Sequence, residues 1–110
     1  MSRSDELRIA DIRDASSELA VIVSRGKAAF LADAILRRAA ERVLEIIGEA
    51  ANSVSEDTKV QFPEIRWRDI SRLRIVLAHH YQRVDPEQVW TIAVSDVPML
   101  VAQLAGEPTP

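Results

Sequence analysis

The sequence contains no cysteine, and its 110 residues include only three glycines, two tryptophans, two phenylalanines and one tyrosine. The absence of cysteine excludes disulfide bonds and thiolate metal sites, which suits a reducing, intracellular compartment. No apolar run approaches the roughly 20 residues that a membrane-spanning helix needs. We therefore expect a cytoplasmic protein with one helical domain over residues 1–110, whose tail is frayed from about residue 105.

The charge of the chain is unevenly placed. The formal net charge is −3, which argues against general nucleic-acid binding by the whole surface. Between residues 66 and 83, however, five arginines stand against the single acid Asp69, a local balance of +4. Such a basic field on an acidic protein can hold a polyanion at one place. A solvated helix face accounts for the same charges.

Apolar residues recur at helical spacing along four long segments. These segments run from Asp5 to about Ser24, from Asp33 to about Asn52, from about Trp67 to Tyr81, and from Pro86 towards the tail. Shorter pieces lie at Ala28 to Ala32 and after Ser55. No segment alternates as a strand does. We predict an all-α fold: an up-and-down four-helix bundle with one or two short extra helices, whose wide apolar stripes favour a dimer.

The second long segment has the broadest apolar face and is expected to lie at the centre of the core. The predicted face consists of Ile35, Leu36, Ala39, Val43, Ile46, Ile47 and Ala50.

Several residues mark the ends of these helices. Gly26 is expected to end the first helix in a left-handed conformation. Ser55 and Asp85 are expected N-caps, each followed by acids in the first turn. Pro98 is expected to bend or restart the last helix, with Asp96 as the cap of its second half.

The stretch from Arg72 to Tyr81 holds the densest set of reactive groups: two arginines, two histidines and the only tyrosine within ten residues. A histidine can act as general base or acid near neutral pH, and an arginine can hold the charge that develops on phosphate. Together they suffice for attack of an RNA 2′-hydroxyl on the adjacent phosphorus, without metal or cofactor. On one helix, however, Arg74 and His79 lie about 140° apart. A joint site therefore needs the helix to end near His79 or a second protomer to face it.

The same residues also fit purely structural roles. His79 and His80 at a helix C-terminus favour the helix dipole, and on a helix they point about 100° apart, a poor pair of ligands for one metal ion. Tyr81 fits a core position with a solvated hydroxyl. The sequence alone leaves both interpretations open.

The block from Trp67 to Tyr81 resembles the HepT family of toxins in the HEPN superfamily. The signature of that family is Arg, four residues, His, one residue, Tyr, and it reads here as Arg74, His79 and Tyr81. The resemblance extends over nearly the whole chain. It includes Asp11-Ile12-Arg13-Asp14, Leu44 to Ala51, Phe62-Pro63-Glu64-Ile65, Val84-Asp85, Val89-Trp90 and Asp96-Val97-Pro98.

The resemblance implies a metal-independent endoribonuclease without cofactor, the toxin of a type VII toxin–antitoxin pair. It implies a homodimer in which the signature residues of two protomers meet in a cleft. Arg74 would stabilise the pentavalent phosphate and His79 would handle the proton. Tyr81 would be modified with AMP by a minimal nucleotidyltransferase antitoxin, which brings negative charge into a site for RNA. The remaining candidates for RNA contacts are Arg68, Arg72, His80 and Arg83.

Two positions depart from the family pattern. Ile75 stands where Asn commonly follows the signature arginine, and Arg72-Leu73 replace the usual Gly-Met before it. The alternative to a ribonuclease is therefore a catalytically weak or inactive HEPN module that serves as partner and substrate of the nucleotidyltransferase.

Overall fold

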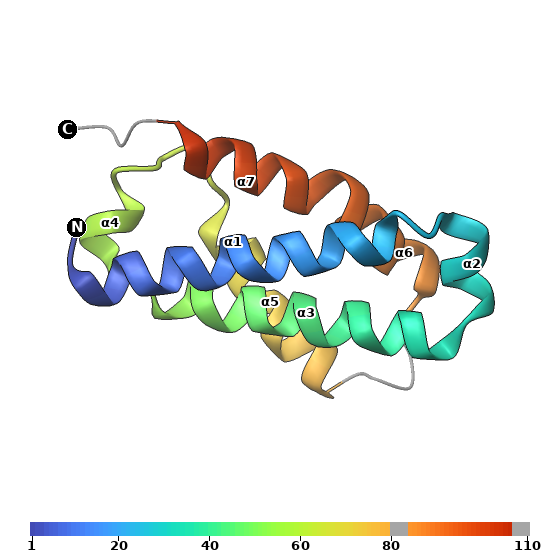
Figure 1. The fold of residues 1–110 in the computed structure, drawn as a ribbon. Coiled ribbons are helices and arrows are strands. Elements are labelled where there is room, and N and C mark those ends of the chain that lie inside the picture. Colours follow the sequence, from blue (N-terminus) through green and yellow to red (C-terminus); the bar gives the residue numbers. More distant parts are fainter. Residues whose placement is uncertain (80–83, 107–110) are drawn as a thin grey trace.

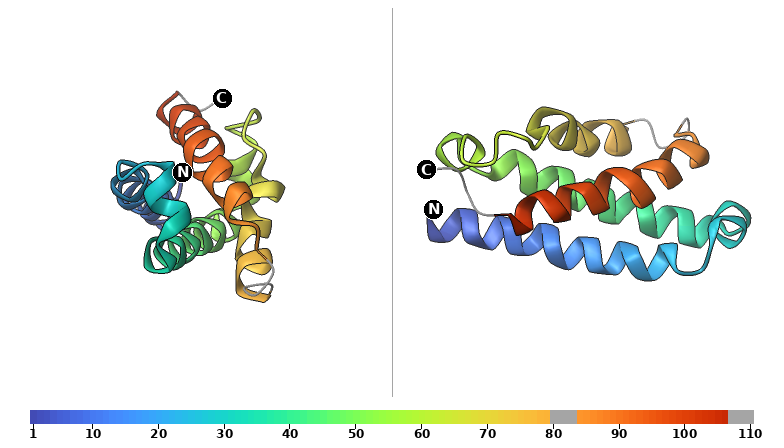
Figure 2. Two further views of the ribbon diagram at one scale, coloured as in Figure 1. Left: turned by 90° about the vertical axis from the view of Figure 1, so that its right-hand side faces the viewer. Right: turned by 90° about the horizontal axis from the view of Figure 1, so that it is seen from above.

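Four long helical segments form an up-and-down bundle, which confirms the predicted all-α fold (Figure 1). The structure is a computed structural model that describes residues 1–79 and 84–106. Its elements are α1 (Arg3–Val23), α2 (Lys27–Ala32), α3 (Ala34–Ser53), α4 (Glu56–Lys59), α5 (Trp67–His79), α6 (Pro86–Thr91), the π-helical turn η1 (Ile92–Asp96) and α7 (Val97–Ala105). The last three form one continuous segment. The short helices α2 and α4 lie at opposite ends of the bundle (Figure 1 and Figure 2).

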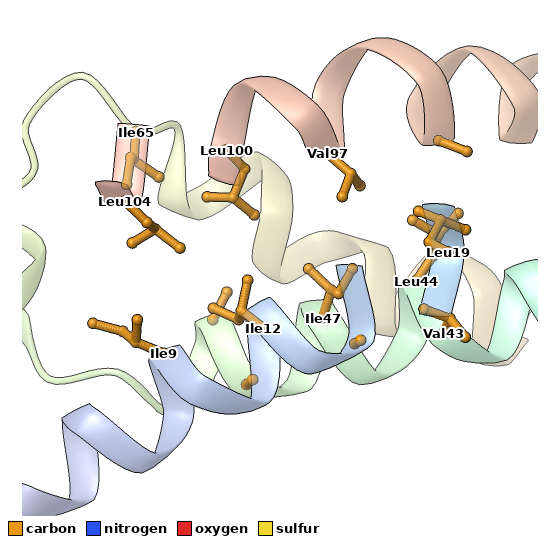
Figure 3. Packing of buried hydrophobic residues seen from close by; sticks show 14 of the residues in the cluster. Ile9, Ile12, Leu19, Val43, Leu44, Ile47, Ile65, Val97, Leu100 and Leu104 are labelled. Atoms are coloured by element: carbon orange, nitrogen blue, oxygen red, sulfur yellow. The ribbon is translucent and has the colours of Figure 1, made fainter. Parts of the chain in front are cut away.

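The core lies where α1, α3 and α7 converge, and Figure 3 shows their buried side chains facing one another. The apolar stripe predicted for the first helix consists of Ile9, Ile12, Ala15, Leu19, Ile22 and Val23. The first four are buried, and Ile22 and Val23 are partly buried against the core. Buried residues of the other helices include Phe30, Ala40, Val43, Leu44, Ile47, Trp67, Leu77, Val89, Ala93, Val97, Leu100 and Leu104. Burial of apolar surface on this scale is the main force that holds such short helices in place.

The predicted apolar face of α3 is partly wrong. Ile35 is 75% exposed and Ala39 is also exposed, so the buried stripe begins at Ala40. Ile35 and Ala40 are five residues apart, which turns their side chains about 140° from each other on a helix. The predicted face therefore included two residues, Ile35 and Ala39, that lie outside the arc facing α1 and α5.

The predicted N-caps Ser55 and Asp85 are confirmed, but the first helix does not end at Gly26 as predicted. The side chain of Ser55 accepts a hydrogen bond from Thr58 N, and that of Asp85 accepts one from Glu87 N. Gly26 has the expected positive φ of 90°, but its ψ of 159° lies outside the left-handed helical region, and it precedes α2. The first helix instead ends at Val23, with Ser24 as its C-cap.

Pro98 is accommodated by the π-helical turn rather than by a new N-cap. Proline has no N–H and its ring crowds the carbonyl four residues earlier, which here belongs to Val94. The turn Ile92–Asp96 contains that residue and widens the helix where the crowding occurs. Asp96 has helical dihedral angles and its side chain caps nothing. The expected restart with an Asp96 cap is therefore wrong.

The continuous segment Pro86–Ala105 meets the length and composition of a membrane-spanning helix, with a mean hydropathy of 1.2 over 18 residues. The expectation that no apolar segment approaches bilayer length is thus corrected. Its buried side chains, 28% of that window, belong to the core of the bundle. A core helix of a helical bundle passes the same test.

Candidate functional site

The candidate site is built on α5, which packs closely against α3. Gly48 makes the close approach possible, because a Cβ there would lie 3.1 Å from the carbonyl oxygen of Ile70 and 3.2 Å from Cβ of Leu73. Asp69 adds an acid to the first turn of α5. The contact fixes the height and rotation of α5, and with them the directions of its arginines.

A groove of about 620 Å³ lies beside α5, between that helix and α4 (the α4–α5 groove). Its lining residues are Asn52, Glu56, Lys59, Val60, Pro63, Ile65, Trp67, Arg68, Ser71, Arg72, Arg74 and Ile75. Four of them are cationic and one is acidic, which gives a balance of +3. A concave site with such a charge concentrates anions from solution.

Arg74 is the most unusual of these cations. Its side chain is half-buried, and its Nε is fully buried without a hydrogen-bond partner among the residues that the structure describes. A buried donor without a partner costs about 1–3 kcal/mol. Such a donor is therefore rare in folded proteins, and a ligand or an ordered water that supplies the acceptor is one explanation for it.

The structure brings three of the predicted residues together. Arg68, Arg72 and Arg74 all line the α4–α5 groove, whereas Arg66 and Asp69 line a different groove of about 380 Å³ beside α7. The charge that looked continuous in the sequence is therefore divided between two faces.

The other predicted site residues lie at or beyond the end of α5. His79 is the last residue of that helix, and its side chain is outside the described part of the structure. His80, Tyr81 and Arg83 also lie outside the described residues. Their predicted roles remain predictions.

Sequence reasoning missed the contributions of α4 and of the C-terminal end of α3. Lys59 and Asn52 line the groove although they lie 15 and 22 residues before Arg74 in the chain. The only local signal was the capped start at Ser55, which predicted a short helix but not its neighbour. Ile75, one of the departures from the family pattern, also lines the groove and is 43% exposed.

A buried carboxylate of α1 holds α4 in position. Asp5 is only 3% exposed and accepts hydrogen bonds from Ser55 Oγ (2.6 Å), Thr58 Oγ1 (2.6 Å) and Ser55 N (2.9 Å). The Ser55 hydroxyl, then the Thr58 hydroxyl and the Ser55 amide, stabilise the charged form and lower the pKa of Asp5 to about 2. Asp5, in the first turn of α1, thereby holds α4 in place, and α4 forms one wall of the groove.

A second charged pocket, of about 260 Å³, lies where α3 faces the start of α6. Arg37, Arg38 and Glu41 line it, and the Arg37 guanidinium donates to the carbonyl oxygen of Leu31. Burial raises the pKa of Glu41, and the two arginines oppose that rise. Its charges are nearly balanced, so it is a weaker anion site than the α4–α5 groove.

Known sequences resemble this chain over most of its length. Residues 12–105 match the family described as "Ribonuclease HepT-like". The "Probable ribonuclease HepT" of Thermococcus cleftensis is 42% identical over 71 residues, which are 64% of each chain. "Putative RNase MJ0127" of Methanocaldococcus jannaschii is 39% identical over 69 residues, 63% of this chain and 57% of that protein.

The aligned residues cover only part of this chain and only part of each relative. The chain spans 57% and 64% of the lengths of these two relatives. No solved structure matches the sequence. The family match nevertheless covers far more than half of the chain, including all of α5 and the residues of the α4–α5 groove. The chain belongs to the HepT-like ribonuclease family.

Proposed function

We propose that this protein is a metal-independent endoribonuclease and the toxin of a type VII toxin–antitoxin pair. One observation carries the proposal: in a chain of a ribonuclease family, the signature arginine Arg74 lines a groove of charge +3, and its buried Nε has no hydrogen-bond partner among the described residues. A phosphate group offers the acceptor oxygens that such a guanidinium lacks.

The proposed reaction needs only side chains of this protein. His79 removes the proton from an RNA 2′-hydroxyl, and the oxygen attacks the adjacent phosphorus. The bond from phosphorus to the 5′-oxygen breaks, and that oxygen takes up a proton. The products are a 2′,3′-cyclic phosphate and a 5′-hydroxyl. Arg74 stabilises the charge that accumulates on the phosphate oxygens.

We further propose a cytoplasmic homodimer with the site at its interface. Ile75 and Val76 on α5 are both 43% exposed, which leaves apolar surface beside the groove for a second protomer. The partner of the toxin is a minimal nucleotidyltransferase, which silences it by transfer of AMP to Tyr81. The added phosphate repels RNA from a site that must admit its backbone.

The test is RNA cleavage in excess EDTA by the purified, unmodified protein. We expect the wild type to leave 2′,3′-cyclic phosphate ends, whereas folded His79→Ala and Arg74→Ala proteins leave the RNA intact. Equal cleavage by either variant would show that the assigned site is wrong.

Ile75 favours a second candidate function. A polar residue that could orient RNA or Arg74 is replaced there by an exposed apolar one. In that case the protein is a weak or inactive HEPN module that acts as partner and substrate of the nucleotidyltransferase. A folded wild-type dimer that cleaves none of several RNAs, yet accepts AMP on Tyr81, would establish this alternative.

A further inference from the structure

We propose that Lys59 and Arg68 bind the backbone of single-stranded RNA on its way to Arg74, so that the α4–α5 groove selects single strands. The inference rests on the proposed ribonuclease function and assigns a substrate class and a new binding residue to the same site. Lys59 lies in α4, whereas Arg74 and His79 lie in α5, and Lys59 has no part in the family signature.

The side chain of Lys59 is buried to an unusual extent for a lysine. Its side chain is only 15% exposed, although lysine normally keeps its ammonium in water. The groove accounts for this position, because Lys59 lines it together with Arg68 of α5. Lys59 therefore adds a cationic side chain to the lining of a hollow that a polyanion can enter.

The ion pair of Lys59 is too weak to explain its burial. Its partner is Glu56 Oε1 at 3.5 Å, and the Glu56 side chain is 87% exposed. An ion pair between residues three apart on a helix, with one largely exposed partner, contributes only about a few tenths of a kcal/mol. An incoming phosphate can displace Glu56 at little cost. Glu56 is also the only acid among the lining residues in the described part of the chain, so its displacement raises the local positive charge.

The cations on two walls of the groove are the basis for the proposed preference for single strands. Lys59 stands on the α4 wall, and Arg68 and Arg72 stand on the α5 wall. A duplex is a stiff convex cylinder, whereas a single strand can bend its phosphates into a hollow. Val60, which is 69% exposed, supplies apolar contact for bases without selecting a sequence.

The experiment measures binding separately from cleavage. The probe is a single-stranded RNA of about 12 nucleotides with 2′-O-methyl groups, which lacks the attacking hydroxyl. Its Kd is measured at several salt concentrations for the wild type and for Lys59→Gln. We expect the slope of log K against log salt to fall by about 0.7 in magnitude for the lost phosphate contact. Glu56→Gln should strengthen binding.

The chain offers a matched control. Lys27 is the only other lysine, and it lies in α2 at the opposite end of the bundle, paired with Glu87 at 2.7 Å. Lys27→Gln should keep the wild-type slope. Arg68→Gln, at an exposed position, provides a second groove variant, with the exposed Arg25→Gln as its control. Thermal melting followed by circular dichroism verifies that each variant is folded.

The outcomes separate this inference from the proposed function. If folded Lys59→Gln and Arg68→Gln both keep the wild-type slope, the groove does not hold the RNA backbone, even if the wild type cleaves RNA in EDTA. Equal affinity for a duplex of the same length would overturn the selection of single strands. Loss of slope in a protein that cleaves no RNA would support the groove and refute the nuclease. Salt-dependent binding of an acidic peptide but not of RNA would assign the groove to a protein partner instead.

Discussion

Gly48 of α3 lies directly against the backbone of Arg74 in α5: a Cβ at Gly48 would lie 2.6 Å from the Arg74 nitrogen. That separation is far shorter than a carbon–nitrogen contact allows, and the obstacle is backbone rather than a flexible side chain. The absence of a side chain at Gly48 therefore sets the position of the signature arginine.

Gly48→Ala should displace α5 from α3 and move Arg74 away from its place in the α4–α5 groove. Overpacking of a tight contact costs about 1–3 kcal/mol, which the better helix propensity of alanine offsets by about 1 kcal/mol at most. We expect a lower melting temperature together with a loss of RNA cleavage larger than the unfolded fraction explains. The measurement is kcat and KM at a temperature where the variant is folded.

Gly106→Ala is the matched control, because a Cβ there meets only the carbonyl oxygen of Gln103, at 3.4 Å. It should leave both stability and cleavage near wild-type values. If Gly48→Ala melts and cleaves as the wild type does, the contact does not position Arg74.

Asp5 makes the stability of the protein sensitive to acid. Its pKa is about 2 in the folded protein against 3.8 as the ordinary value, so folding favours the charged form. The resulting stabilisation, about 2 kcal/mol, is fully present above the unfolded pKa and is lost as the pH falls towards 2. Asp5→Asn should therefore reduce the free energy of unfolding at pH 7, and its difference from the wild type should shrink below about pH 4.

Urea unfolding at a series of pH values measures this difference. Asp14→Asn, at an exposed position of the same helix, serves as the control and should show no such pH dependence. A constant difference between Asp5→Asn and the wild type from pH 7 to about pH 3 would contradict the role of the carboxylate charge.

The fold could be predicted largely from the sequence, because helical periodicity and caps are local signals. The stripe of α1 and the caps Ser55 and Asp85 were predicted correctly for that reason. The predictions were wrong where packing against neighbouring helices or the geometry of the helix itself determines the structure. Ile35 is apolar but lies outside the arc that α1 and α5 cover. Pro98 is accommodated by a π-helical turn, which no local pattern in the sequence predicts.

Only the part of the candidate site that lies within one helix, α5, could be predicted from the sequence. Arg68, Arg72 and Arg74 follow helical spacing within α5 and were expected on the basis of charge. Lys59 could not be found in this way, since its approach to α5 depends on the Asp5 brace and on the Gly48 contact. These are long-range contacts, between residues that a single sequence does not link.

Arg74→Lys tests whether the planar guanidinium is needed, since it keeps the charge but removes the fork that binds two phosphate oxygens. We expect cleavage to fall by about 100-fold, the usual effect of losing one stabilising donor. Stability should not fall by more than about 1 kcal/mol, because the buried Nε makes no hydrogen bond with the described residues that the change could break. Arg72→Lys is the control at an exposed position of the same helix and should change cleavage by less than about tenfold. Equal losses in both variants would show that Arg74 has no special role.

Tyr81→Phe tests the proposed regulation. With the partner nucleotidyltransferase and ATP, the wild type should gain mass in steps of one AMP unit, whereas Tyr81→Phe should gain none. Ser71→Ala removes another hydroxyl, one that lines the α4–α5 groove, and should gain mass as the wild type does. The same mass gain on Tyr81→Phe would exclude that tyrosine as acceptor. Loss of the gain in Ser71→Ala alone would identify a different acceptor.

A mixture of two inactive variants tests whether the site spans two protomers. Arg74 and His79 lie about 140° apart on one helix, so a shared site requires Arg74 of one protomer and His79 of the other. In that arrangement a mixed dimer of Arg74→Ala and His79→Ala contains one site that lacks both residues and one that is intact. Random pairing makes half of the dimers mixed, so co-expression should restore about a quarter of the wild-type cleavage. Co-expression of His79→Ala with His79→Gln should restore none, because every site then lacks the base. If the first mixture is as inactive as the second although the protein is dimeric, each site takes both residues from one protomer, and α5 must then end so that His79 turns towards Arg74.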